Sequence, residues 1–171
     1  PWGWGRPGWH AECAAMAMAV HGSSLDVLVG GADLAFPHHA FQSAMVRAAT
    51  GVAPFARCVV HVGTVLVDGE KMAKSTGNLV LVDDLLRSCS PSALRLLLLD
   101  RPWSEPWSWE PGLLDAAETR LERLYAAAAR RPAGGADDTA AAREAVTARL
   151  RDDLDVPGAL ALAEELGGEA A

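Results

Sequence analysis

Two short apolar runs that alternate with helix-like sequence constrain the fold of this chain most strongly. Residues 25–29 and 57–62 have the length and the Val and Leu content of buried strands. Helical sequence occupies residues 10–20, which are rich in Ala and Met, and residues 37–50, which open with a proline. Strands that alternate with helices predict an α/β fold with an open parallel sheet.

Ligands of such a sheet bind in the crevice outside the carboxyl ends of its strands. The first predicted strand runs into Gly30 and Gly31, where the backbone can approach a ligand closely. The second predicted strand runs into residues 61–65. We therefore expect residues 30–33 and 61–65 to share one site.

The second half of the chain is predicted to be helical. Helical patterns cover residues 83–88, 92–100 and 111–130, and a last helix opens at residues 155–157. The predicted parts are 1–80 for the α/β region, 81–131 for a helical region, and 132–171 for a polar linker at 132–138 with the C-terminal helices.

The composition limits the classes of protein to which the chain can belong. With 171 residues, of which 50% are hydrophobic, it is a globular chain and not a disordered one. It has no apolar run long enough to span a bilayer, so we expect no membrane partner. Three cysteines, an odd number at irregular spacing, predict a cytoplasmic protein. A net charge of −7 disfavours broad electrostatic capture of nucleic acid.

A basic segment after a tight turn indicates nucleotide chemistry. Asp68 and Gly69 form a turn dipeptide after an apolar run, and Lys71 and Lys74 follow closely. Two lysines on a mobile loop can stabilise a departing pyrophosphate. The alternative interpretation of these four residues is a solvated hairpin.

Cys13 and His38 are the candidate metal ligands. They supply a soft sulfur and an imidazole from neighbouring elements, as Zn²⁺ prefers, although Cys13 could instead be a small core residue. Gln42 lies one helical turn after His38, but its amide is a poor zinc ligand. An open coordination position could take a substrate thiolate and so select cysteine over serine. We expect His39 to pack beside the site and give His10 no role.

Three ordered segments, at residues 5–13, 30–39 and 68–78, resemble the class I cysteinyl-tRNA synthetase superfamily. The resemblance is close over the first two thirds of the chain and looser at residues 152–160. It implies the C-terminal half of a Rossmann-like catalytic domain at residues 1–80, followed by an α-helical appendage with a stem-contact region. The other half, with a His-Ile-Gly-His signature and another zinc cysteine, should precede Pro1, so we expect the chain to be inactive by itself.

Two branches of the superfamily are candidates: cysteinyl-tRNA synthetases and the mycothiol ligases. The segments at 55–63, 77–86 and 107–109 are similar to the ligase pattern, and Gln42 replaces a glutamate that is usual in the synthetases. The acidic C-terminal segment also suits a tRNA backbone poorly. The ligase resemblance implies ATP-dependent activation of L-cysteine and its transfer to the amine of glucosaminyl-inositol, by a full-length monomer. A tRNA partner belongs to the alternative.

The resemblance also implies particular site residues. Cys13 and His38 would hold one Zn²⁺ whose third protein ligand comes from the preceding half, Trp9 would line the cysteine pocket, and Lys71 and Lys74 would be catalytic. ATP would bind together with Mg²⁺. It would contact Gly31, Ala32, Asp33, Val65, Lys71, Met72, Ala73, Lys74 and Ser75.

The chain departs from the superfamily pattern at several of these segments. Val29 replaces a glycine, Ala40 a glutamate and Ala73 a serine. These changes sustain a third hypothesis, a degenerate paralogue that binds nucleotide or a partner without catalysis.

Overall fold

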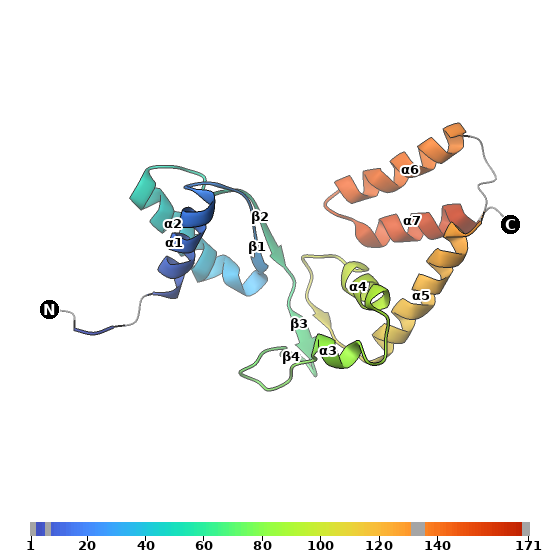
Figure 1. Ribbon diagram of the computed structural model, residues 1–171, viewed down its shortest axis with the longest axis horizontal. Coiled ribbons are helices and arrows are strands. Elements are labelled where there is room, and N and C mark those ends of the chain that lie inside the picture. The colour runs from blue at the N-terminus through green and yellow to red at the C-terminus, as the bar shows by residue number, and fades with distance from the viewer. Residues whose placement is uncertain (1–2, 6–7, 131–135, 169–171) are drawn as a thin grey trace. The chain divides into compact units, whose positions relative to one another are not determined.

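A computed structural model of the protein describes residues 3–5, 8–130 and 136–168. The chain forms two compact units, Pro1–Thr64 and Val65–Ala171, which are described separately below (Figure 1). The division falls after Thr64, so the predicted lysine segment belongs to the second unit.

The described residues of the first unit form two α-helices and two parallel strands. Its elements are α1 (Trp9–His21), β1 (Leu25–Gly31), the short helical turns η1 (Ala32–Leu34) and η2 (Ala35–His39), α2 (Ala40–Thr50) and β2 (Ala56–Val62). In the β1–β2 pair, Gly30 lies opposite His61 and Gly31 lies opposite Val62. Both predicted strands and their parallel direction are thereby confirmed.

The regular helix α2 begins later than the sequence predicted. Phe36, with φ −140° and ψ 134°, is extended, so the backbone is irregular through η2 and regular only from Ala40. At the other end, Gly51 adopts the left-handed conformation with φ 74° and accordingly ends the helix near the predicted residue.

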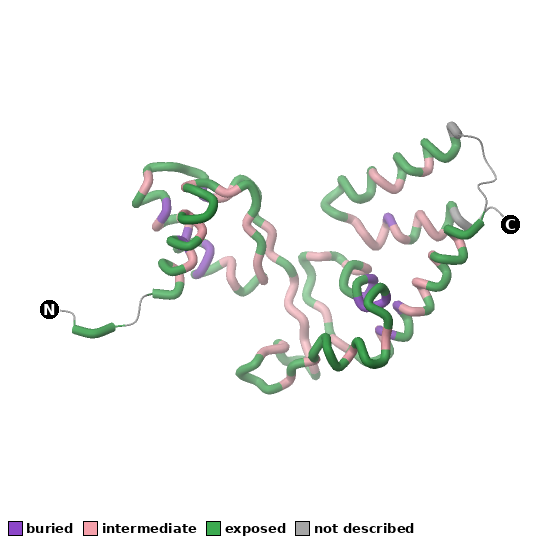
Figure 2. The backbone as a smooth tube through the Cα atoms, viewed as in Figure 1, coloured by how far each residue is buried: buried purple, intermediate pink, exposed green. Residues whose placement is uncertain are grey.

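The core of the first unit is small and lies between the helices and one face of the strands. Ala14, Val46 and Phe55 are buried, and Leu25 and Leu28 pack against them (Figure 2). The strands also carry exposed valines: Val27 is 54% exposed and Val29 is 59% exposed. The first unit therefore leaves much of its apolar strand surface uncovered.

The second unit combines a small sheet with five helices among its described residues. Its elements are β3 (Val65–Val67), β4 (Glu70–Lys71), α3 (Val82–Leu85), α4 (Pro91–Leu99), β5 (Trp107–Ser108), α5 (Gly112–Ala128), α6 (Ala136–Arg151) and α7 (Val156–Gly168). The strand β3 pairs antiparallel with β4 and parallel with β5. The sequence did not predict β5, a two-residue strand that is defined by its partner.

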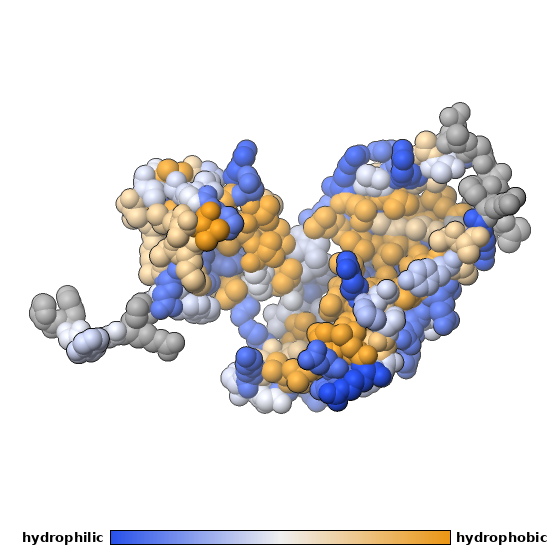
Figure 3. All heavy atoms as spheres, in the orientation of Figure 1, coloured by the Kyte–Doolittle hydropathy of each residue, from blue (hydrophilic) through white to orange (hydrophobic). Residues whose placement is uncertain are grey.

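Leucines from α4 and α5 build the core of the second unit. Leu94, Leu97, Leu114 and Ala117 are buried against one another. The start of α4 is capped by Ser90, whose hydroxyl accepts a hydrogen bond from the Ala93 N–H at 3.1 Å. In Figure 3, apolar atoms also reach the surface of both units.

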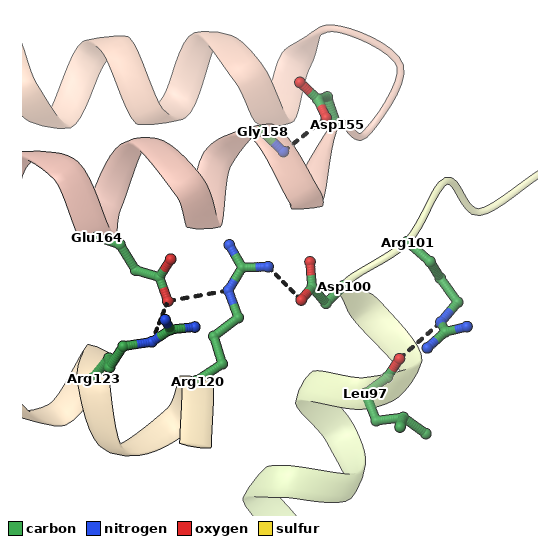
Figure 4. A network of polar contacts seen from close by, with 8 residues as sticks. All are labelled: Leu97, Asp100, Arg101, Arg120, Arg123, Asp155, Gly158 and Glu164. Carbon is green, nitrogen blue, oxygen red and sulfur yellow. Dashed lines mark hydrogen bonds and ion pairs between the residues drawn. The ribbon is translucent and has the colours of Figure 1, made fainter. Parts of the chain in front are cut away.

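An ion-pair network joins α4, α5 and α7. Arg120 of α5 donates to Asp100 and, through Nε at 3.1 Å, to Glu164 of α7, while Arg123 lies 3.8 Å from the same carboxylate (Figure 4). At the start of α7, Asp155 Oδ1 accepts from the Gly158 N–H at 2.9 Å. The contacts of Arg120 and Arg123 with Glu164 hold α7 against α5, while the Asp155 contact caps the start of α7.

The predicted linker at 132–138 lies partly outside the described residues. Residues 136–138 belong to α6, which is rich in alanine at its start, while residues 131–135 lie outside the described part. None of the helices in the described residues is both long and apolar enough to span a bilayer.

Candidate active site

Two histidines meet beside the carboxyl ends of β1 and β2: His39 from η2 and His61 from β2. His39 Nδ1 lies 2.8 Å from His61 Nε2, and the two rings are stacked with their centroids 5.0 Å apart. Gly30 makes room for this pair, because a Cβ atom at Gly30 would lie 2.6 Å from His39 Cε1. Gly30 and His61 are register partners, so the two strand ends that were predicted to share a site lie side by side.

The surroundings of the His39 ring favour its neutral form, because they lower its pKa. Burial lowers the pKa of His39, and the neighbouring rings of His61 and His38 lower it further. One nitrogen of the His39–His61 contact must donate and the other accept, which two neutral rings can do.

His38, the predicted imidazole ligand, is buried and has a partner at each ring nitrogen. Burial lowers its pKa, and His10 lowers it further. Its Nε2 accepts from the Gln42 amide nitrogen at 2.7 Å. In the neutral ring Nδ1 then carries the proton and donates to His10 Nδ1, also at 2.7 Å. Gln42 thus faces His38, as its position one turn later predicted.

Trp9 and His10 complete the surroundings of His38. The Trp9 ring stacks on the His38 ring with centroids 4.0 Å apart and an angle of 25°. His10 received no role from the sequence, since no local pattern signals a contact between residues 28 positions apart. These contacts place Trp9 beside His38, the predicted metal ligand. They do not test whether Trp9 lines a cysteine pocket, which stays a prediction.

The donors for a metal are present in part. A neutral imidazole and a thiolate are the forms that bind Zn²⁺. Cys13 is a free, half-buried cysteine on α1, which packs against α2, and its thiol would lose its proton on binding the metal. A metal can bind His38 only if one of the two His38 ring nitrogens loses its present partner, His10 at Nδ1 or Gln42 at Nε2. Among the described residues, no three side chains of His, Cys, Asp or Glu gather into a metal-binding group. By the chemistry of their donor atoms, Cys13 and His38 are suitable zinc ligands, and their assignment to one site stays a prediction.

The predicted adenylate segment follows β1 directly. Gly31 ends the strand, and Ala32 and Asp33 lie in η1. A Cβ atom at Gly31 would meet Asp33 Oδ1 at 2.5 Å, so the Asp33 carboxylate folds back over the Gly31 backbone. This closeness is available to glycine alone without moving that side chain.

The lysine loop, residues 71–75, follows a hairpin in the second unit. Asp68 and Gly69 have φ values of 52° and 81°, which form the predicted tight turn between β3 and β4. The Met72 N–H donates to the Val65 carbonyl at 2.9 Å, extending the hairpin. Lys71 and Lys74 are exposed and are the two lysines of the whole chain.

The comparison with protein families identifies the class. The family described as "tRNA synthetases class I (C) catalytic domain" matches residues 1–119. The chain belongs to this family.

Individual relatives narrow the resemblance. The chain is 52% identical over 162 residues to the L-cysteine:1D-myo-inositol 2-amino-2-deoxy-alpha-D-glucopyranoside ligase of Thermobispora bispora, covering 95% of this chain and 40% of the relative. It is 53% identical over 166 residues to the ligase of the same name from Acidothermus cellulolyticus, covering 96% and 40%. It is also 46% identical over 168 residues to the cysteine–tRNA ligase of Rhodospirillum rubrum, covering 98% and 36%. The chain thus spans at most 40% of these curated relatives.

Solved structures agree on the fold. The agnB2 LeuRS of Agrobacterium radiobacter K84 aligns with 85% of this chain, and the chain with 23% of it, at a TM-score of 0.64 and 21% identity. The methionyl-tRNA synthetase of Mycobacterium tuberculosis aligns with 84% of this chain, and the chain with 32% of it, at a TM-score of 0.57 and 22% identity. The predicted fold, part of a class I synthetase catalytic domain with a helical appendage, is confirmed.

Proposed function

We propose that the full-length protein containing this chain activates L-cysteine with ATP and transfers it to the amine of glucosaminyl-inositol. The observation that carries the activation step is the hairpin that presents both lysines of the chain on one exposed loop. The similarity to ligases named for L-cysteine and an amino-sugar inositol supports the acceptor.

In the first step the cysteine carboxylate oxygen attacks the α-phosphorus of ATP. The new O–P bond forms as the bond between the α-phosphorus and the bridging oxygen breaks, and pyrophosphate leaves with the released electron pair. Lys71 and Lys74 stabilise the negative charge that develops on the leaving group. Met72, Ala73 and Ser75 complete the loop around the phosphates, and Val65 contacts the adenine. Mg²⁺ accompanies the nucleotide.

In the second step the acceptor amine attacks the carbonyl carbon of the adenylate. A C–N bond forms, AMP leaves, and the amine loses a proton. Gly31, Ala32 and Asp33 hold the adenylate during both steps, with the glycine backbone close to the ligand and the Asp33 carboxylate accepting a hydrogen bond. Trp9 lines the cysteine pocket.

In this proposal Cys13 and His38 would hold one Zn²⁺, together with a third protein ligand outside this chain. When bound, zinc would supply a binding position for the substrate thiolate, which would favour cysteine over serine. The stacked Trp9 ring and the Gln42 amide orient the His38 ring for this task.

Location and assembly complete the proposal. The three cysteines are free thiols in the structure, which suits the reducing environment of the cytoplasm. We expect the full-length protein to be a monomer.

The central experiment gives the full-length protein ATP, L-cysteine and either glucosaminyl-inositol or tRNA. We expect cysteine-dependent exchange of pyrophosphate into ATP, and transfer to the sugar amine alone. Transfer to tRNA alone would instead establish the cysteine–tRNA ligase activity that the 46% identical relative suggests. Absence of both exchange and bound zinc would establish the non-catalytic paralogue.

The zinc assignment has its own test. The Cys13→Ser variant of the full-length protein is expected to lose bound zinc, measured by elemental analysis of the purified protein. Cys58→Ser is the matched control, because Cys58 is an exposed thiol on β2. Equal zinc content in the two variants would remove Cys13 from the ligand set.

A further inference from the structure

Asn78, the one asparagine of the chain, lies shortly after the lysine loop and bridges two of its backbone groups. Its Oδ1 accepts a hydrogen bond from the Ala73 N–H at 2.9 Å. Its Nδ2 donates to the Lys71 carbonyl at 3.1 Å. One side-chain amide therefore holds two backbone groups, one on each side of Met72.

The surrounding groups fix the orientation of this amide. The Ala73 N–H is a donor and the Lys71 carbonyl is an acceptor, so exchanging the oxygen and nitrogen of Asn78 would leave both contacts unsatisfied. The Thr76 hydroxyl lies 2.6 Å from Asn78 Oδ1 and 2.8 Å from the Ala73 carbonyl. Its single hydrogen can serve one of these acceptors at a time.

The backbone conformation of residues 76 and 77 turns the Asn78 side chain toward the Lys71 and Ala73 backbone. The Thr76 N–H donates to the Ala73 carbonyl and the Gly77 N–H donates to the Lys74 carbonyl, both at 3.3 Å. Gly77 then has φ 71°, a left-handed conformation that glycine adopts at little cost. The chain reverses at this residue, and the Asn78 side chain returns to the Lys71 and Ala73 backbone.

We propose that Asn78 is a positioning residue for the activation step. Its amide holds the backbone on both sides of Met72, so that Lys71 and Lys74 project from a loop of defined shape. This inference rests on the proposed function, because it assigns the lysines to the departing pyrophosphate. Asn78 itself does not touch the reacting atoms and acts through the backbone that carries the two ammonium groups.

The physical reason is the reach of the lysine side chain. The ammonium group of lysine sits at the end of a flexible side chain. If the backbone that carries it is held in one conformation, the charge reaches the transition state at a lower entropic cost. Removing the amide leaves the loop attached to its hairpin but lets its shape vary. The loss should therefore appear in the rate of the chemical step more than in ATP binding.

The kinetic test measures cysteine-dependent pyrophosphate exchange by the full-length protein, with rates normalised to titrated active sites. For Asn78→Ala we expect kcat to fall roughly 10- to 100-fold while the KM for ATP stays within about threefold. Asn78→Asp should fall in between, because its carboxylate keeps the acceptor for Ala73 but sets an oxygen against the Lys71 carbonyl. Ser92→Ala, an exposed change on α4, is the control and should match wild type.

A second measurement follows the loop without requiring catalysis. A lysine-specific protease can cut this chain only after Lys71 and Lys74, and mass spectrometry locates the cuts. Under native conditions the Asn78→Ala variant should be cut at these sites about tenfold faster than wild type, because the bridged conformation protects them.

The outcomes separate the two proposals. A wild-type protein without exchange would overturn the proposed function and, with it, the positioning role. An active wild type whose Asn78→Ala variant keeps its kcat per site would overturn the positioning role alone. Unchanged cleavage at Lys71 and Lys74 would show that the bridge does not restrain the loop, and would overturn it too.

Discussion

The two units hold their candidate functional residues by different means. In the first unit, close ring packing adds to the hydrogen bonds of the histidines: Trp9 stacks on His38, and the His39 ring lies so close to Gly30 that no Cβ atom fits there. In the second unit, hydrogen bonds and ion pairs do this work, as with Asn78 in the lysine loop and Arg120 between the helices. The first unit should therefore respond most to added volume, and the second to a lost polar partner.

The largest expected effect concerns chemistry in the second unit. Replacing Lys74 with alanine should lower cysteine-dependent pyrophosphate exchange roughly 100- to 1,000-fold, the usual cost of losing a charge-stabilising group in the transition state. Since Lys74 is exposed, the midpoint of thermal unfolding should stay the same. Arg95→Ala, an exposed cation lost from α4, is the control and should keep full exchange. A loss below threefold for Lys74→Ala would mean that the exposed loop does not carry the activation step.

The next effect concerns the ion-pair network. Arg120→Met should destabilise the second unit by about 1–3 kcal/mol, because the Arg120 side chain is only 18% exposed. Its loss would leave the half-buried carboxylates of Asp100 and Glu164 without this cationic partner. Arg123→Met should cost about 0–1 kcal/mol, since Arg123 is 65% exposed and more distant from Glu164. Native-state hydrogen exchange of α5 and α7 amides in the full-length protein measures both changes. Equal costs would show that Arg120 contributes no more than a surface charge.

The corresponding test of the first unit adds a methyl group at a tightly packed position. Gly30→Ala should destabilise that unit by about 1–3 kcal/mol, because the new methyl group collides with the buried His39 ring. Gly112→Ala in the second unit meets open space at the start of α5 and should stabilise it by about 0.5–1 kcal/mol. Hydrogen exchange of β1 and α5 amides reports the two changes. A neutral Gly30→Ala would mean that the His39 ring moves aside without cost.

Elements whose conformation depends on residues close in the sequence could be predicted from the sequence. The Asp68 turn, the β1 and β2 strands and the helices α1, α4 and α5 all depend on nearby residues, and each lies within a few residues of its predicted place. The strand β5 and the His10 contact depend on partners far along the chain, so no pattern within their own segments indicated them. The contacts of Asn78 were not predicted for a different reason: an asparagine after a glycine signals a turn but not which backbone groups its amide will bind.

The smallest effect compares how the two units begin their helices. In the second unit Ser90 caps α4, and Ser90→Ala should cost about 1 kcal/mol because the Ala93 N–H loses its acceptor. In the first unit Gly8 precedes α1 without a side-chain cap, so Gly8→Ser should stabilise α1 by a few tenths, about 0.3 kcal/mol. Hydrogen exchange of the first-turn amides in each helix measures both, with Ser88→Ala as a control next to α4. Faster exchange at α4 and slower exchange at α1 is expected. If Ser90→Ala leaves the α4 amides unchanged, that helix is held by its buried leucines alone, and the polar contacts of the second unit matter less than its core.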